Sequence, residues 1–533
     1  MTGEPARRFA LVNARVRPLA GPPLAGGLVV ADGRVERLLG AGEAPPADLP
    51  AHDLGGRCVI PGLVDAHTHF GLWALSLKEL SLRDARSAGE VAELVAERAA
   101  DGDEWLTGGA TERAADGDEW LTAGGWREQV LGPVERATLD RAVPGRPVAL
   151  VASDRHTLWL NSAALERAEA AGVLGGADVV ERDGGGRPTG VLREVAAWRV
   201  RDRFLLPSLD RLTEAIAEAL PLAHARGVTA VHDKDGWIGI HRAWARLRAA
   251  GRLRLRVFQS LPATEGAAAA ARAAAEHSDP EWLRIGYLKL FADGTLGSGT
   301  ALLSDGRGTQ VTAPADLRRL VAEAADAGLP VAVHAIGDRA TKQVIDAFEA
   351  TEDRWRPAGL RQRIEHAQLL APRDLDRMAA LGISASVQFP QLLYDRDVRG
   401  LPAGVLHHAH RTMLEAGVRL ASGSDCPIDD LDPIAALAAG VTRTSGGREP
   451  WQPGERLTVE QALVAATGTP AWIEGREGER GALTPGRAAD AVVLDDDPFT
   501  VDPARLASLR VVATMVAGEW VHGAPRARAE AVA

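Results

Sequence analysis

The sequence predicts an α/β fold: a (β/α)8 TIM-type barrel, a small β-sandwich domain formed by the two ends of the chain, and a long insertion after the first barrel strand. Eight short apolar segments alternate with helical stretches rich in Ala, Leu and Arg. Both ends of the chain carry short β-branched runs separated by Gly and Asp turn signals. The 533 residues exceed one ordinary core but suit a barrel with a smaller satellite domain.

The eight expected barrel strands are apolar segments that each end in polar residues. They cover residues 59–70, 227–233, 253–260, 283–294, 329–338, 361–368, 382–390 and 418–427. We place the barrel domain at 61–470. The interval of about 71–226 between the first two strands is too long for one crossover and contains a strand candidate at 147–154, so we predict an insertion there. Insertions on the catalytic face of a barrel usually shape the pocket.

The two ends of the chain are predicted to complete one β-sandwich, with residues 1–60 as its N-terminal part and 471–533 as its C-terminal part. The runs RFALVNARV and GGLVVADGRVERLLG are typical of antiparallel strands, and DAVVLDDDP and LRVVATMVAGEWVHG resemble them. Chain termini often lie close together in a domain, which favours a shared sheet.

A tandem duplication lies inside the insertion. The segment ERAADGDEWLT occurs at 97–107 and again at 112–122. Two copies cannot form a solenoid, which needs about three repeats or more. We expect the second copy to lead into the strand before Trp126 and the first copy to bulge out, with no functional role for the duplication.

Composition narrows the function classes. Hydrophobic residues make up 46% and charged residues 25%, as in folded soluble proteins. The net charge of -11 has the wrong sign for binding nucleic acid. No apolar run is long enough for a membrane span or a signal peptide, and two cysteines are too few for a disulfide framework. These features predict a cytoplasmic protein with no nucleic-acid or membrane partner.

His67 and His69 form an H-x-H pair on an apolar strand. Side chains alternate along a strand, so both rings point to the same side, which in a barrel is the interior. Two neutral imidazoles at the end of a strand suit a metal such as zinc. The alternative is a pair of structural histidines in a polar barrel mouth; Asp65 would orient them in either case.

Three more polar residues stand where apolar strands give way to loops, namely His334, His366 and Asp425. A lone histidine at a strand end is more often structural than a ligand. Several such ends together with an H-x-H pair favour a metal site, because catalytic groups of barrels come from several strand ends on one face.

Lys289 lies among Ile, Tyr, Leu and Phe in a chain where only four of 61 basic residues are lysines. Burial of a charged amine there would be costly. A neutral amine can instead add carbon dioxide to give a carbamate, an anionic ligand able to bridge two metals, which arginine cannot do. The alternative is a snorkelling or salt-bridged lysine.

Five further residues are candidates for contact with the substrate or for orienting the ligands. They are Trp126 and His156 in the insertion, Asp293 after the lysine, and Asp338 and Arg339 after the fifth-strand histidine. Ordinary packing is an equally good explanation for each.

The ordered motifs resemble the amidohydrolase superfamily, and more narrowly amidohydrolase family 3, which includes YtcJ-like proteins and N-substituted formamide deformylases. The motifs are PGLVDAHTH, YLKLFADGTLGSGTA, VHAIGDRA, RIEHAQ, SGSDCPI and GALTPGRAADAVVLDDDP. Tyr287, at a position where an aliphatic residue is expected, is a small departure. The resemblance spans nearly the whole chain.

The resemblance implies a centre of one or two divalent metal ions, with zinc expected. His67 and His69 would hold one ion, which Asp425 completes. His334 and His366 would hold a second ion, and carboxylated Lys289 would bridge the two.

The implied activity is hydrolysis of a small molecule at a non-peptide carbon–nitrogen bond, in an amide, cyclic amide or N-formyl group. A metal-activated hydroxide would attack, and Asp425 would act as acid and base. The alternatives are an esterase, lactonase or phosphoesterase using the same site, and a non-catalytic barrel scaffold. No glycine-rich turn with phosphate-binding spacing favours a nucleotide or redox enzyme. A homodimer is compatible with such enzymes, although no apolar stripe requires it.

Overall fold

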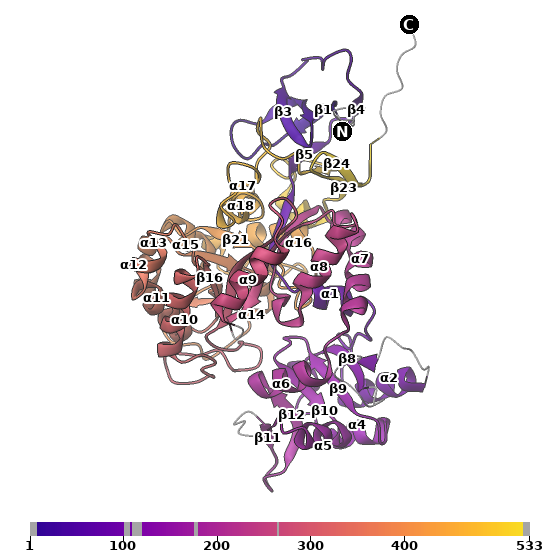
Figure 1. Ribbon diagram of the computed structural model, residues 1–533, viewed down its shortest axis with the longest axis vertical. Coiled ribbons are helices and arrows are strands. Elements are labelled where there is room, and N and C mark those ends of the chain that lie inside the picture. The colour runs from indigo at the N-terminus through magenta and orange to yellow at the C-terminus, as the bar shows by residue number, and fades with distance from the viewer. Residues whose placement is uncertain (1–7, 101–106, 109–119, 175–179, 264–265, 526–533) are drawn as a thin grey trace.

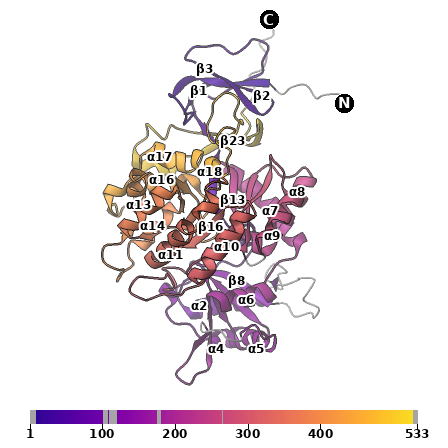
Figure 2. The same ribbon diagram turned by 60° about the vertical axis from the view of Figure 1, so that its left-hand side comes forward.

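The computed structural model describes residues 8–100, 107–108, 120–174, 180–263 and 266–525. Three bodies follow one another along its longest axis (Figure 1). The terminal sheet lies at one end, the barrel in the middle and the insertion at the other end, and the second view keeps this order (Figure 2).

The barrel contains eight parallel strands in sequence order, one in each predicted segment. The strands are β6 (Leu63–Thr68), β13 (Val228–Asp233), β14 (Arg256–Pro262), β15 (Leu283–Phe291), β16 (Val331–Ala335), β17 (Arg363–His366), β19 (Ser384–Val387) and β21 (Leu420–Ser422). The predicted α/β barrel is therefore confirmed.

The last strand meets the first through loop contacts. The backbone nitrogen of Asp425 donates to the carbonyl of His67 at 2.7 Å, and that of His69 donates to the carbonyl of Cys426 at 2.9 Å. Gly423 permits this approach, because a Cβ atom there would lie 2.3 Å from the backbone nitrogen of His67. The glycine of SGSDCP thus brings strand eight against the H-x-H strand.

Helices cover the outside of the barrel. They are α1 (Phe70–Ser76), α7 (Leu209–Ala225), α8 (Ile240–Ala249), α9 (Ala267–His277), α10 (Pro314–Asp326), α11 (Asp338–Glu349), α12 (Glu352–Trp355), α13 (Pro372–Leu381), α14 (Leu392–Asp395), α15 (His410–Glu415), α16 (Pro433–Thr442), α17 (Val459–Ala465) and α18 (Gly468–Ile473). Local sequence signals begin several of them. In α16, Asp432 accepts hydrogen bonds from the nitrogens of Ile434 and Ala435 ahead of Pro433.

The insertion folds around its own six-stranded sheet, in the order β11-β12-β10-β9-β8-β7. Its elements are α2 (Ala88–Ala100), β7 (Thr107–Gly108), β8 (Trp120–Trp126), α3 (Glu128–Leu131), α4 (Arg136–Ala142), β9 (Val148–Ala152), β10 (Thr157–Leu160), α5 (Ser162–Ala170), β11 (Val180–Arg182), β12 (Pro188–Arg193) and α6 (Glu194–Phe204). Helix α7, which follows, shares a core with α1 and α8 and so serves as the crossover into β13.

The duplicated segment contributes to neighbouring strands. Trp120 and Leu121 of the second copy begin β8, and Thr107 of the first copy pairs with Leu121 in antiparallel register. The expected bulge of the first copy falls on residues 101–106, which lie outside the described ranges.

The two ends of the chain share one eight-stranded sheet, as predicted. Its strands are β1 (Arg8–Val16), β2 (Leu24–Ala31), β3 (Arg34–Leu39), β4 (Ala51–Asp53), β5 (Cys58–Pro61), β22 (Ala491–Leu494), β23 (Val511–Val516) and β24 (Glu519–His522). Strand β22 pairs with β5, while β1 runs parallel to β4 and β5. Side chains from both ends, such as Val59 and Met515, are buried in one core.

Candidate metal centre

His67, His69 and Asp425 form the tightest group of possible metal ligands at the barrel mouth. One ligand atom of each lies within 4.8 Å of the others. Asp425 Oδ1 is 3.2 Å from His67 Nε2 and 3.5 Å from His69 Nε2. Two imidazoles and a carboxylate are the donor set of many zinc sites, so these residues fit a divalent metal.

Each histidine of the H-x-H pair is oriented by a buried carboxylate. His67 Nδ1 lies 2.5 Å from Glu365 Oε2, and His69 Nδ1 lies 2.7 Å from Asp235 Oδ1. Such contacts fix the Nδ1–H tautomer and leave Nε2 as the ligand atom. Sequence reasoning missed both carboxylates, although Glu365 adjoins His366 and Asp235 directly follows the second barrel strand.

Asp65 holds the first and last strands together, consistent with its expected orienting role. Its Oδ1 accepts hydrogen bonds from the backbone nitrogens of His67 at 3.1 Å and Ser424 at 3.0 Å. Two of the proposed ligands have left-handed backbone conformations, with φ of 59° at Asp425 and 72° at His366. Such strain in residues other than glycine is concentrated at functional sites.

His334 and His366 extend the histidine cluster on the other side. Their ring centroids lie 4.5 Å apart, and His366 lies 4.8 Å from His67. His334 Nε2 is 3.0 Å from the carbonyl of Gly294, and His366 Nδ1 is 2.7 Å from Gln388 Oε1. Each histidine therefore keeps one nitrogen for a ligand role. Burial lowers the pKa of His366 to about 3, so its ring is neutral.

Lys289 is buried as its apolar setting predicted. Its Nζ lies 3.7 Å from the centroid of the Phe291 ring and 3.3 Å from the carbonyl of Leu290. Burial lowers the pKa of Lys289 to about 7, although the charges of Glu365 and Asp425 oppose the shift. A large fraction of this amine is therefore neutral near pH 7, as reaction with carbon dioxide requires.

A second buried lysine, Lys234, escaped sequence reasoning. Its Nζ donates to the hydroxyl of Tyr287 at 2.8 Å and to Glu365 Oε1 at 3.1 Å. Arg363 Nε lies 2.7 Å from the same oxygen. Burial would raise the pKa of Glu365, but Arg363 and Lys234 outweigh it and hold that pKa well below its ordinary value behind His67. Tyr287, the departure from the expected aliphatic residue, anchors Lys234.

Asp425 remains a carboxylate despite its burial. Burial alone would raise its pKa, but His67, His366 and His69 outweigh that effect and lower the pKa below its ordinary value. Its second oxygen is 3.3 Å from Gln391 Nε2. An ionised carboxylate in this position can accept a proton.

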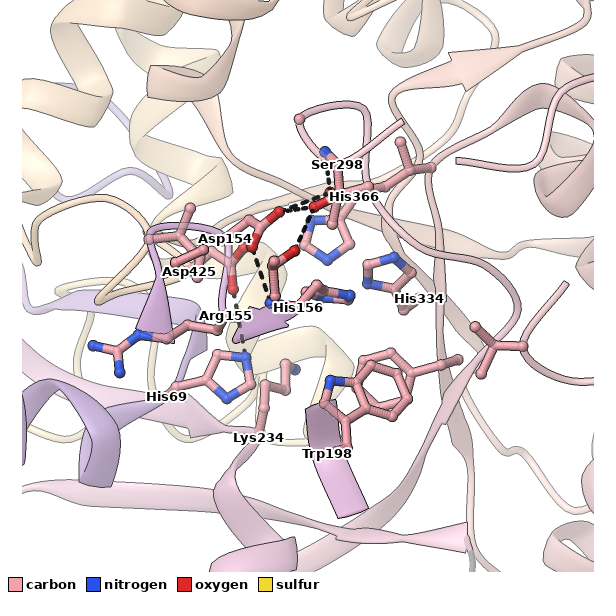
Figure 3. Close-up of a pocket in the computed structure, with 18 of the residues that line it drawn as sticks. His69, Asp154, Arg155, His156, Trp198, Lys234, Ser298, His334, His366 and Asp425 are labelled. Carbon is pink, nitrogen blue, oxygen red and sulfur yellow. Dashed lines mark hydrogen bonds and ion pairs between the residues drawn. The ribbon is translucent and has the colours of Figure 1, made fainter. Parts of the chain in front are cut away.

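The cluster opens into a cavity of about 1610 Å³ between the barrel and the insertion. The barrel contributes all six proposed ligands, while the insertion contributes Trp126, Asp154, Arg155, His156, Trp198 and Arg201 to the lining. Figure 3 shows His69 facing Asp425, with His156, His334 and His366 gathered beside them.

The five candidate substrate residues differ in position. His156 and Trp126 line the cavity, although Trp126 is fully buried and its Nε1 donates to the carbonyl of Leu150. Asp293 accepts hydrogen bonds from three backbone nitrogens, and Asp338 accepts one from Ser304. Arg339 is exposed, and neither it nor these two aspartates is among the lining residues.

His156 of the insertion lies beside the histidine cluster. Its ring centroid lies 5.7 Å from that of His334. Its Nδ1 is 2.7 Å from Glu194 Oε2, and the other oxygen of Glu194 accepts a hydrogen bond from Thr300 of the barrel loop at 2.7 Å. Burial lowers the pKa of His156, but Glu194 and Asp154 more than reverse this and raise it. The insertion thus delivers a hydrogen-bond donor to the cavity.

Comparison with known proteins decides the family. The model described as "Amidohydrolase family" matches residues 51–522. The chain belongs to this family. The match takes in the barrel, the insertion and strands β4, β5, β22, β23 and β24 of the terminal sheet, and the resemblance seen in the motifs is confirmed.

Curated relatives cover most of this amidohydrolase. Putative amidohydrolase YtcJ of Bacillus subtilis is 30% identical over 93% of this chain and 94% of its own. N-substituted formamide deformylase of Arthrobacter pascens is 29% identical over 96% and 98%. The LONG AFTER FAR-RED 3 protein of Arabidopsis thaliana is 30% identical over 88% and 83%.

Solved structures agree with the fold. An uncharacterized metal-dependent hydrolase from Pyrococcus horikoshii has a TM-score of 0.73 at 24% identity, covering 93% of this chain and 99% of its own. Another from Pyrococcus furiosus has a TM-score of 0.69 at 26% identity, covering 92% and 100%. Family and donor set together identify a metal-dependent amidohydrolase.

Among the described helices, none combines the length and apolarity needed to cross a membrane.

Proposed function

We propose that this protein hydrolyses a non-peptide carbon–nitrogen bond, in an amide, cyclic amide or N-formyl group, at the centre formed by His67, His69 and Asp425. The convergence of these three ligand atoms within 4.8 Å, beside a large cavity, carries the proposal. A bound divalent ion, with zinc expected, would supply Lewis acidity and lower the pKa of water from about 15.7 towards 7.

Asp425 moves the proton in this proposal. Its Oδ1 lies 3.2 Å from Nε2 of His67 and 3.5 Å from Nε2 of His69, the atoms that would hold the ion activating the attacking water. It takes a proton from that water and returns it to the leaving nitrogen, because an amide nitrogen departs too slowly without protonation. Gln391, hydrogen-bonded to the second oxygen, holds the carboxylate in place.

Lys289 is proposed to serve as a carbamate, with His334 and His366 as ligands of a second ion. The neutral amine adds to carbon dioxide, forming a nitrogen–carbon bond and releasing one proton. Burial of Lys289 and its position on the cavity wall support this role. One ion at His67 and His69 would meet the catalytic requirement, and the carbamate extends the site to two.

The substrate class follows from the relatives and the cavity. One relative that nearly spans the chain is an N-substituted formamide deformylase, which acts on a C–N bond. The cavity adds the aromatic rings of Trp198 and Phe291, whose centroids lie 5.2 Å apart, and the polar His156. An N-substituted amide with an apolar substituent fits such a lining.

The test combines metal removal with a substrate panel. Chelation should abolish hydrolysis and added Zn2+ should restore it. Elemental analysis before treatment should assign one or two ions per chain to this centre, as the difference between the wild type and His67→Ala/His69→Ala. Lys289→Ala should lower the metal content and remove the carbamate resonance seen by 13C NMR after incubation with 13C-bicarbonate. Lys342→Ala, which changes a partly exposed lysine paired with Asp346, is the matched control and should change neither.

The panel contains N-formyl, N-acyl and cyclic amides together with esters, lactones and phosphoesters. The highest kcat/KM should fall on one of the amides. A higher value for an oxygen ester would refute the assignment to carbon–nitrogen bonds. Metal-loaded protein that hydrolyses nothing in the panel would support a non-catalytic scaffold.

A further inference from the structure

A second group of possible metal ligands lies outside the proposed centre. One ligand atom from each of Asp395, His407 and His408 lies within 4.8 Å of the others. Asp395 ends α14, and His407 ends β20 (Leu406–His407), the strand that pairs with β18 (Leu369–Leu370). All three residues are buried, with exposed fractions of 8%, 9% and 2%.

His408 and Asp395 alone would make an ordinary buried ion pair, with His408 Nε2 2.9 Å from Asp395 Oδ2. His407 is the residue that such a pair does not explain. Its Nε2 is buried and has no hydrogen-bond partner among the described residues. A buried polar nitrogen without a partner is costly, and a metal ion would satisfy it.

The two imidazoles are held in fixed positions before any ion binds. The ring of Trp451 packs edge-on against His407 at 4.9 Å and against His408 at 6.0 Å. The backbone of His408 is fixed on both sides. Its carbonyl accepts a hydrogen bond from Arg443 at 3.1 Å, and its backbone nitrogen donates to the carbonyl of Gln368 at 2.9 Å. His408 also has a left-handed backbone, with φ of 46°, as do two of the proposed ligands at the barrel mouth.

The group has a donor set and an access route suited to an ion. Two imidazoles and one carboxylate form a donor set that zinc accepts. Ligand atoms of a tetrahedral zinc site lie roughly 3.3 Å apart, so small side-chain rotations would close the group. Asp395 lines the large cavity, through which an ion can enter.

We propose that Asp395, His407 and His408 bind a divalent transition-metal ion such as Zn2+, at a site separate from the centre at His67. The two groups share no side chain. Gln391 and Gln368 lie between them, joined by a 2.7 Å hydrogen bond, with Gln391 reaching Asp425 and the carbonyl of Gln368 holding the backbone of His408. Three protein ligands leave one coordination position for water or an anion.

The test counts bound ions in tag-free, full-length protein. Metal-stripped samples are dialysed against Zn2+ and analysed for metal, both in the wild type and in a His67→Ala/His69→Ala background. Adding His407→Ala should remove about one ion per chain from the wild type and from the His67→Ala/His69→Ala protein. The affinity of this site for Zn2+ should fall at least tenfold. His277→Gln, a histidine of α9 outside both groups, is the matched control and should remove none.

Asp395→Asn guards against a folding defect in His407→Ala, because it keeps nearly the same shape and removes only the charge. It should remove the same ion while circular dichroism stays unchanged. Equal ion counts with and without His407→Ala in both backgrounds would overturn the proposal. Retention of the ion in Asp395→Asn, or an equal loss in His277→Gln, would overturn it as well.

Discussion

The barrel mouth and the insertion face the same cavity but are built differently. At the mouth, His67 and His69 are buttressed by the buried carboxylates of Glu365 and Asp235. In the insertion, the contact is looser: Nη1 of Arg155 in the cavity wall lies 3.9 Å from Oε2 of Glu79. Reacting groups lie on rigid strand ends, where small displacements are costly, whereas the wall tolerates variation.

His156 is held more closely than Arg155 on the insertion side. Glu194 fixes it as firmly as Glu365 fixes His67, and Thr300 ties Glu194 to the barrel. We therefore propose that the two regions differ in function, with the barrel supplying the chemistry and the insertion selecting the substrate. Substitutions should separate them, with kcat responding in the barrel and KM in the insertion.

The largest effect is expected for Asp425→Asn. The amide keeps the shape of the side chain but cannot accept the proton, so kcat should fall about 10³-fold. Steady-state kinetics on the best amide substrate measures this. Metal content by elemental analysis separates loss of the base from loss of the ion. A fall of less than tenfold with metal retained would exclude Asp425 as the proton carrier.

Glu365→Gln should act on the metal rather than on the proton. Loss of the charge behind His67 should weaken metal affinity about 10-fold to 100-fold. Competition with a fluorescent chelator gives the affinity. Glu415→Gln, which changes an exposed glutamate of α15, should leave it unchanged. Equal affinities in the wild type and Glu365→Gln would show that the carboxylate only balances Lys234 and Arg363.

His156→Gln tests whether His156 acts in substrate binding or in the reaction itself. Loss of one hydrogen bond to the substrate, about 1.4 kcal/mol, should lower kcat/KM about tenfold. The loss should appear mainly in KM, with metal content unchanged. A loss confined to kcat would instead place His156 with the reacting groups of the barrel.

Trp198→Ala should have the smallest effect. Removing roughly 25 Å² of apolar contact costs about 0.6 kcal/mol, so KM should rise about threefold for amides with bulky substituents. Small N-formyl substrates should show no change. A uniform rise across the panel would show that Trp198 supports the wall through its packing on Phe291 and not through the substrate.

The sequence predicted those residues of the proposed centre that stand out in a local sequence pattern. His67, His334, His366 and Asp425 each end an apolar run, and a barrel places such ends on one face. Lys289 stood out because this chain prefers arginine. The eight strand segments were recognisable for the same reason, since parallel strands buried on both faces are nearly continuous apolar runs.

The partners of these residues were not predictable in the same way. Glu365 meets His67 across 298 positions of sequence and Asp235 meets His69 across 166, so no local pattern links them. Trp126 was expected at the cavity and lines it, but its ring packs against Trp159. The LHHAH run at 406–410 could not be recognised as a possible metal site from the sequence, because only the fold brings Asp395 beside it.

The pairing of β5 with β22 also limits when the terminal sheet can form during synthesis of the chain. A nascent chain that ends at residue 425 already contains every proposed ligand. Its β5 strand, which leads straight into the strand of His67, has β1 on one side but still lacks β22 on the other, since Pro61 pairs with Ala491. The terminal sheet can therefore be completed only after nearly the last part of the chain is made. A truncation that removes only the C-terminal strands should then leave the H-x-H strand unanchored on one side.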